Sequence, residues 1–220
     1  MLNDMFPFLA GLSDTDRDLL QKSIITRQFH EDEMVNQTAN GCAGLLAVES
    51  GQLRVYIMSD EGREVTLFRV ESGEICVLSV SCVLDSIMFD VFIKATEETT
   101  VRVIPAVVLK NLMAGNDKVS LFLYKTAAEK FSDVMWTMHQ MLFMRVDQRI
   151  AIYLWDEMNR QKDTELALTH ETIARQIGSS REVITKIMRS FEEEKILSLS
   201  RGKITVLDKS ALKAKAYPAM

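Results

Sequence analysis

Alternation of hydrophobic and polar residues dominates the chain between residues 24 and 104. The clearest example follows a turn at Gly51-Gln52, where Leu53, Val55 and Ile57 alternate with Arg54, Tyr56 and Met58. A second turn, at Glu61-Gly62, precedes another run rich in Val and Leu. A period of two with turns between short runs predicts antiparallel hairpins, and many in succession predict a sandwich or roll. A short helix beginning at Ser13 is expected before this region.

A helical period replaces the alternation from residue 121 onwards. Apolar positions recur there in alternating steps of three and four residues, at Leu121, Tyr124, Ala128, Phe131, Met135, Met138 and Leu142. This is a heptad seam, narrower than the apolar face of a helix that lies on a globular core. A parallel dimer interface is therefore favoured over the alternative, a core helix packed on the roll. The polar stretch 145–148, with Asp147 as the N-cap of a following helix, predicts the end of this helix.

Two short helices are predicted in the segment LTHETIARQIGSSREVITKIMRSF, which begins at residue 168. Thr169 is the expected N-cap of the first helix, and Gly178 supplies the left-handed residue that ends it. Ser179 and Glu182 have the spacing of a capping box at the start of the second. One face of this second helix is apolar and the other is basic and polar. Together with a hairpin turn at 200–203, this pattern predicts a winged helix-turn-helix.

The distribution of charge agrees with a nucleic-acid partner near the C-terminus. The 220 residues have a formal net charge of −5, but residues 1–144 carry 12 basic and 20 acidic side chains, whereas residues 145–220 carry 14 and 11. A local basic surface decides attraction to phosphate. The apolar runs are too short to span a bilayer and the start has no basic leader, so a cytoplasmic protein without a membrane partner is expected. Cys42, Cys76 and Cys82 are too few for a disulfide framework.

The chain as a whole resembles the CRP/FNR family of bacterial transcription regulators. The motif IARQIGSSREVITKIM at residues 173–188 is similar to the recognition unit of that family. The resemblance implies an α+β fold. Its parts are an N-terminal antiparallel β-roll of the double-stranded β-helix type (residues 1–116), a long dimerisation helix (117–145) and a C-terminal winged helix-turn-helix (146–220).

Carried over by position, the resemblance implies two groups of DNA contacts. Base edges in the major groove would be read by Arg181, Glu182, Thr185 and Lys186. Lys186 stands where the family often has arginine, which removes the planar fork, and Glu182 is either a base reader or only a helix cap. Phosphates would be contacted by Thr169, His170, Ser180, Arg189 and Lys203. The alternative for His170 is a surface position without a role.

The effector side of the family fits this chain less well. Val77 and Leu78 occupy the places of the Gly-Glu pair that holds a cyclic nucleotide, and Phe89 and Asp90 those of an Arg-Ser pair. A phosphate would lose its arginine and face a carboxylate, so cyclic AMP is not expected. A small effector in an apolar pocket is expected instead, and the candidate lining residues are Cys76, Leu78, Phe89, Met135 and Met138.

Other sensing chemistries of the family depend on cysteine. The iron–sulfur members use an N-terminal cysteine cluster, whereas residues 1–30 contain no cysteine. Cys76 lies where the haem-containing members have a thiolate ligand, but Leu78 occupies the region of their histidine. Haem is therefore a minor alternative, and no cofactor or metal is assigned.

The expected function is that of a homodimeric transcription regulator, gated by a small effector, that binds double-stranded DNA at a two-fold operator. RNA polymerase is a further candidate partner. The alternative is a haem or thiol-based redox or gas sensor of the same family that acts through Cys76 or Cys82. An enzyme is not expected, because the histidines at 30, 139 and 170 are isolated and no nucleophile spacing or phosphate-binding loop accompanies them.

Overall fold

The computed structural model describes residues 5–36, 44–80 and 91–218. The chain divides into two compact units, of which the first comprises Met1–Met58 and Leu67–Met135 and the second Ser59–Thr66 and Trp136–Met220. Each unit is described by itself below. The division falls inside the long helix and not at its ends, and the three domains expected from the sequence stay a prediction.

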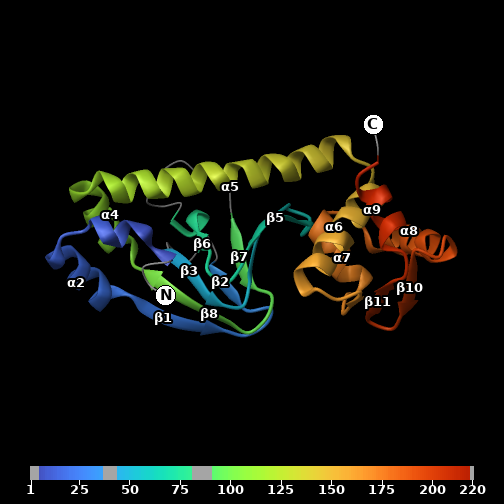
Figure 1. The fold of residues 1–220 in the computed structure, drawn as a ribbon, viewed down its shortest axis with the longest axis horizontal. Coiled ribbons are helices and arrows are strands. Elements are labelled where there is room, and N and C mark those ends of the chain that lie inside the picture. Colours follow the sequence, from blue (N-terminus) through green and yellow to red (C-terminus); the bar gives the residue numbers. More distant parts are fainter. Residues whose placement is uncertain (1–4, 37–43, 81–90, 219–220) are drawn as a thin grey trace. The chain divides into compact units, whose positions relative to one another are not determined.

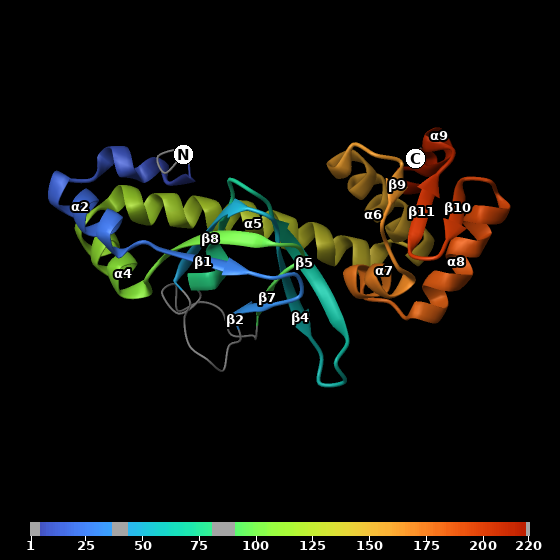
Figure 2. The ribbon, with the colours of Figure 1, turned by 90° about the horizontal axis from the view of Figure 1, so that it is seen from below.

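Two four-stranded antiparallel sheets form the first unit, apart from the first residues of β5, which belong to the second (Figures 1 and 2); this confirms the predicted roll. One sheet has the strand order β1-β8-β3-β6 and the other β2-β7-β4-β5. Each sheet pairs segments that are far apart in the sequence. Ile25 pairs with Val103 in the first sheet, and Leu53 pairs with Ala95 in the second. The strands are β1 (Ile25–Phe29), β2 (Met34–Asn36), β3 (Leu45–Ser50), β4 (Leu53–Met58), β5 (Glu64–Val70), β6 (Ile75–Cys76), β7 (Phe92–Ala95) and β8 (Thr99–Ile104).

Strand β3 is buried on both faces, which accounts for its continuous apolar sequence. Leu46 and Val48 belong to the core between the two sheets. Leu45 and Ala47 belong to a second core, which the helices of this unit share. Because successive side chains of a strand point to opposite faces, a strand covered on both sides needs apolar residues throughout.

Strand β4 departs from the predicted alternation. Leu53 and Val55 are buried as expected, but Arg54 and Tyr56 are buried as well. The guanidinium carbon of Arg54 lies 4.4 Å from the centre of the Tyr56 ring. That ring stacks on Phe92 with 5.4 Å between the ring centres. Contact with an aromatic ring favours burial of a cation. Arg54 and Tyr56, the polar positions of the alternation, therefore do not form a solvent-facing side of β4.

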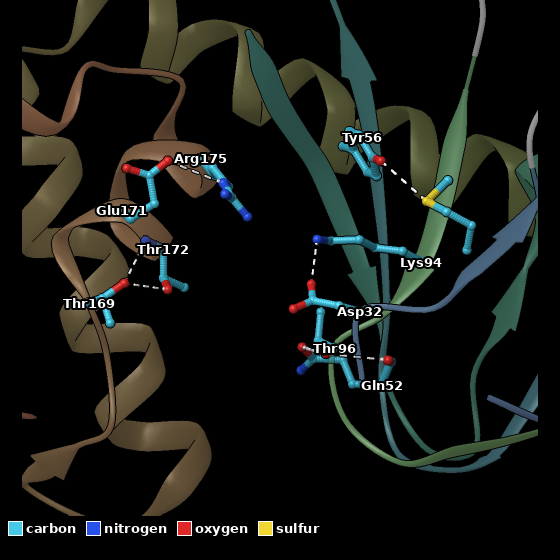
Figure 3. A network of polar contacts seen from close by, with 10 residues as sticks. Asp32, Gln52, Tyr56, Lys94, Thr96, Thr169, Glu171, Thr172 and Arg175 are labelled. Atoms are coloured by element: carbon cyan, nitrogen blue, oxygen red, sulfur yellow. Dashed lines mark hydrogen bonds and ion pairs between the residues drawn. The ribbon is translucent and has the colours of Figure 1, made fainter. Parts of the chain in front are cut away.

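Polar contacts fix the register of the second sheet near its ends (Figure 3). Lys94 Nζ donates to Asp32 Oδ1 at 2.6 Å. Thr96 Oγ1 donates to Gln52 Oε1 at 2.8 Å, and the Tyr56 hydroxyl lies 3.5 Å from the sulfur of a methionine in β2. The first two contacts join the segments before β2 and β4 to the end of β7, and the third joins β4 to β2.

Helices cover the outer face of the first sheet and complete the second core. The predicted helix after Ser13 is present, and the Asp16 N–H donates to the Ser13 hydroxyl at 3.1 Å. Phe6, Leu9 and Leu20 are buried in this core although the sequence analysis assigned them no role. The helical segments are η1 (Pro7–Gly11), α2 (Asp14–Ser23), η3 (Val77–Val80), α4 (Ala106–Gly115) and α5 (Asp117–Phe143).

Helix α5 has two apolar stripes. One stripe packs on the first unit, where Val119 and Leu123 are buried and Ala127 and Val134 contact its cores. The other is the predicted heptad seam, and all seven of its side chains from Leu121 to Leu142 are exposed in the single chain. A core helix and a seam helix were alternatives by sequence, whereas α5 carries both faces, because a helix is wide enough for two separate stripes.

The second unit is a winged helix-turn-helix, as predicted (Figure 1). Its sheet has the order β10-β11-β9, and its core includes Ile150, Ile173, Ile184, Phe191 and Ile204. Helix α9, which was not expected from the sequence, contributes Leu212 and Ala216 to this core. The elements are α6 (Val146–Gln161), β9 (Glu165–Leu166), α7 (His170–Ile177), α8 (Arg181–Glu193), β10 (Leu197–Ser200), β11 (Lys203–Val206) and α9 (Lys209–Ala216).

The predicted N-cap of α6 is wrong. Arg145 occupies that position without a side-chain cap, and Asp147 lies in the first turn. The Asp147 carboxylate pairs with Arg145 at 3.1 Å. A carboxylate inside the first turn still stabilises the positive end of a helix, so the residue type was informative while its position was not.

Within the described ranges, no helix has both the length and the apolar character that crossing a membrane requires.

The two predicted hairpin glycines allow a matched test of backbone strain. Gly51 and Gly62 both have positive φ, of 84° and 77°. A Cβ at Gly51 would lie 2.5 Å from the Glu98 carbonyl oxygen, whereas one at Gly62 would meet nothing within 4 Å. We expect Gly62→Ala to lower Tm by about 2–4 °C from the φ penalty alone, and Gly51→Ala to lower it by at least about twice as much. Equal shifts in a thermal melt followed by circular dichroism would contradict this.

Candidate nucleic-acid interface

The turn between α7 and α8 has the geometry that the sequence predicts. Thr169 is the N-cap of α7, and its hydroxyl accepts the Thr172 N–H at 3.0 Å (Figure 3). Gly178 ends the helix in the left-handed region with φ 65° and ψ 49°. A side chain is disfavoured in that conformation, so glycine permits the sharp change of direction between the two helices.

Arg149 braces this turn from α6. Its Nη1 donates to the Ile177 carbonyl oxygen at 2.9 Å, at the end of α7. The side chain is buried, and burial lowers the pKa of its guanidinium from the usual value. The last carbonyls of a helix lack partners in the helix and carry partial negative charge, so a cation there stabilises the turn. Arg149 was not a candidate by sequence, because an arginine beside an apolar stripe does not show which carbonyl its guanidinium will donate to.

The N-cap of α8 is Ser180, one residue later than predicted. Its hydroxyl accepts the Val183 N–H at 3.3 Å. The capping box of Ser179 with Glu182 is therefore wrong, since Glu182 lies two residues after the N-cap and not three. Of the two roles considered for Glu182, the structure gives no support to capping, and its side chain is exposed in the first turn of α8.

The exposed face of α8 is rich in cations. Arg181, Lys186 and Arg189 are exposed and Thr185 is partly buried. They line a shallow hollow of about 840 Å³, whose lining residues are Arg181, Glu182, Thr185, Lys186, Arg189, Ser190 and Glu193. Within the described part of the chain, no ion pair joins the three cations of this hollow to a carboxylate. The four predicted base-reading residues therefore share one face, and its cations are available to an anion.

A second hollow lies between the start of α7, the start of α8 and the wing. It has a volume of about 390 Å³, and Thr169, His170, Arg181 and Lys203 are among its lining residues. Lys203 pairs with Glu165 of the neighbouring strand β9. The structure thus brings three of the predicted phosphate contacts together here, whereas Ser180 lies at the start of α8 and Arg189 lines the larger hollow.

His170 contacts helix α8 directly. Its Nδ1 lies 3.0 Å from Thr185 Oγ1. Burial, followed by the nearby charges of Arg181 and Arg189, holds the pKa of His170 below its ordinary value. The contact gives the imidazole a defined orientation against α8, and its role as a phosphate contact stays a prediction.

The candidate effector residues are not all brought together. Cys76 is fully buried in the core of the roll, and Leu78 packs against both cores of the first unit. Met135 and Met138 are 43% and 46% exposed, and Val134 is the neighbouring α5 residue that contacts the roll. Phe89 lies outside the described residues, as do Cys42, Cys82 and Asp90.

The chemistry of Cys76 is that of a packed apolar side chain. Burial raises the pKa of its thiol to about 12, so the thiolate is scarce at neutral pH. In the ranges that the structure describes, no three His, Cys, Asp or Glu side chains gather as a metal site would require. Cys76 is thus placed for packing and not for reactivity.

Comparison with known proteins agrees with this geometry. A family model described as the Crp-like helix-turn-helix domain matches residues 148–215. The crystal structure of a transcriptional regulator of the CRP/FNR family from Eubacterium rectale is 40% identical, with 97% of this chain and 99% of that chain covered and a TM-score of 0.94. The transcriptional activator protein FnrA of Stutzerimonas stutzeri is 24% identical over 97% of this chain and 89% of its own length. Anr of Pseudomonas aeruginosa is 24% identical over 94% and 86%. These proteins are transcription regulators and not enzymes.

The corrected cap of α8 can be tested with adjacent serines. Ser180→Ala removes the acceptor of the Val183 N–H and should lower the free energy of unfolding by about 1 kcal/mol. Ser179→Ala should change it by less than about 0.5 kcal/mol. Urea denaturation of the two variants measures the difference. A larger loss in Ser179→Ala would restore the cap that the sequence predicted.

Proposed function

Because the chain belongs to the CRP/FNR family of transcriptional regulators, we propose that it acts as a homodimer that reads a two-fold DNA operator with α8. It is a regulator with a DNA-binding helix-turn-helix. The observation that carries the proposal is the exposed face of α8, where three cations without ion pairs among the described residues surround a polar centre. A helix of this kind fits the major groove, and cations around it attract the phosphates.

The proposed base contacts are Arg181, Glu182, Thr185 and Lys186. Arg181 and Lys186 offer donors that match the O6 and N7 acceptors of guanine. Glu182, which makes no capping bond, can accept from the amino group of cytosine. The proposed phosphate contacts are Thr169, His170, Ser180, Arg189 and Lys203. They surround the base readers on the α7 side, at the wing and further along α8, as a clamp on both strands of a groove would require.

The proposed homodimer rests on the exposed stripe of α5. Leu121, Tyr124, Phe131 and Leu142 are between 61% and 69% exposed. From the first to the last seam residue the stripe extends for about 30 Å at the helical rise of ~1.5 Å per residue. A strip of apolar side chains in steps of three and four is complementary to a second copy of itself across a two-fold axis. A two-fold protein in turn calls for an operator with two half-sites.

The proposed effector is a small molecule other than cyclic AMP, and its binding would favour the DNA-competent state of the dimer. The proposal of an apolar or weakly polar ligand rests on the sequence, since Cys76 itself is fully buried in the core and Leu78 packs against it. The second candidate, a haem or thiol sensor, finds no support at Cys76, because a buried protonated thiol is a poor nucleophile and a poor ligand. The activator names of two relatives support RNA polymerase as a further partner.

Removal of the two cationic base readers should abolish specific recognition. The double variant Arg181→Ala, Lys186→Ala should weaken binding by at least about 2 kcal/mol, since each good base contact contributes about 1–3 kcal/mol. Fluorescence anisotropy on a duplex selected by the wild-type protein from a random library measures this. Lys110→Ala, Lys209→Ala is the matched control, because both lysines are exposed and lie outside the two hollows. Specific binding with an unchanged salt slope in the first variant would show that another element reads the DNA.

A charge on the α5 stripe should separate the dimer. Phe131→Asp places two carboxylates in an apolar interface and should weaken dimerisation by about 3 kcal/mol or more. The residue is 65% exposed, so the folded subunit should tolerate the change. Sedimentation equilibrium measures the association, and Val107→Asp, at a 71% exposed apolar position of α4, is the control. An unchanged dimer in Phe131→Asp together with a monomer in Val107→Asp would move the interface to α4.

A further inference from the structure

We propose that His170 couples operator binding to the uptake of one proton by each subunit of the dimer. The ring nitrogen Nδ1 forms a hydrogen bond with Thr185 of α8. The other nitrogen, Nε2, becomes a donor to a DNA phosphate only when the imidazole is protonated. The inference rests on the proposed DNA-binding function, and it adds a role for His170 that a simple phosphate contact does not have.

The hydrogen bonds of Thr185 fix the tautomer of His170. The Thr185 hydroxyl donates to the Arg181 carbonyl oxygen at 2.8 Å, one turn earlier in α8. A hydroxyl has a single proton, so its oxygen can only accept in the 3.0 Å contact with His170 Nδ1. Nδ1 therefore carries a hydrogen. In the neutral ring Nε2 then has none and presents a lone pair.

This arrangement makes the charge state of His170 decide its interaction with DNA. A neutral ring with a hydrogen on Nδ1 offers only a lone pair at Nε2, and a lone pair cannot accept from a phosphate oxygen and is repelled by it. A protonated ring donates from Nδ1 to Thr185 and from Nε2 to the phosphate at the same time. The Thr185 contact is compatible with both states, so the proton changes the phosphate contact without releasing α8.

The same hydrogen bonds restrict what Thr185 can read. Its proton is already donated to Arg181 and one lone pair already accepts from His170. What remains for a base is the methyl group, which suits the methyl of thymine, and one lone pair, which can accept from an amino group but leaves no donor for a base acceptor. His170 is in this sense a positioning residue for a specificity-determining side chain.

The charges around His170 favour an anion next to it. From α8, Arg181 and Arg189 act on the ring. From the wing, Lys203 lines the same hollow and pairs with Glu165, and from α7 itself Glu171 pairs with Arg175 at 3.3 Å. The two carboxylates are thus each paired with a cation, while Thr169 and the first two residues of α7 line the hollow. A phosphate is attracted to such a site.

The sign of the pH dependence follows from these contacts. In the free protein, burial and then Arg181 and Arg189 hold the pKa of His170 below its ordinary value, so the ring is neutral at pH 7. A bound phosphate raises this pKa. The extra affinity is fully present below the pKa of the free protein and is lost as the pH rises through the pKa of the complex. Affinity should therefore rise on acidification.

The first experiment measures affinity against pH for the full chain. We expect each His170 to contribute about three- to tenfold between about pH 7.5 and about pH 5.5, since one pKa unit corresponds to a factor of ten. With two subunits on one duplex selected from a random library, the Kd of the dimer should fall by about ten- to a hundredfold. His170→Gln keeps a donor for Thr185 but does not titrate, and it should remove most of this dependence. His30→Gln should retain it, because His30 titrates in contact with Glu98 in the other compact unit.

The second experiment observes the ring directly. Long-range proton–nitrogen correlation of the three histidines, assigned with the His170→Gln variant, should show the hydrogen of free His170 on Nδ1 at neutral pH and a higher pKa after the duplex is added. A hydrogen on Nε2, or a pH dependence of affinity that survives in His170→Gln, would overturn the inference. A protein that binds no duplex specifically at any pH would instead refute the proposed function.

Discussion

A helix with two apolar stripes can bury only one of them against its own chain, and this constraint shapes the whole protein. In α5, Val119 and Leu123 are covered by the first unit, while the heptad seam remains exposed in the single chain. Apolar surface left in water costs about 25 cal/mol per Å², so the second stripe calls for a partner of the same shape. The proposed dimer supplies it, and the two-fold symmetry expected of the operator is a consequence of the same stripe.

The DNA-binding unit depends on a different kind of constraint, the polar groups at helix ends. Within a span of twelve residues, the hydroxyls of Thr169 and Ser180 accept backbone N–H groups and Gly178 changes the direction of the chain. Arg149 donates to a carbonyl oxygen at the end of α7. The apolar side of α8 meets the core through Ile184, Met188 and Phe191. Because both the ends and the inner side of α8 are held, its cations are presented on a rigid support, as recognition of base edges requires.

The sensing side shows how burial changes the meaning of a residue type. Cys76 is a thiol by sequence and a core side chain by environment, with the pKa of its thiol raised to about 12. Arg54 is a cation by sequence and is 1% exposed over the ring of Tyr56. Neither property can be read from a pattern of apolar and polar letters, since both depend on strands that are distant in the sequence.

The sequence by itself determined the main elements and their order, though not α9, because period, caps and turns act within a few residues. The roll, the long helix, the glycine turn, the wing and the outward face of α8 were all predictable in this way. Their exact ends were not: the cap of α8 is Ser180 and not Ser179, because two adjacent serines both suit a cap and spacing alone does not separate them. Only the tertiary structure decided which contacts cross between elements: Arg149 with Ile177, His170 with Thr185, and Val134 with the roll. Such contacts depend on distances between side chains far apart along the chain, which no local spacing encodes.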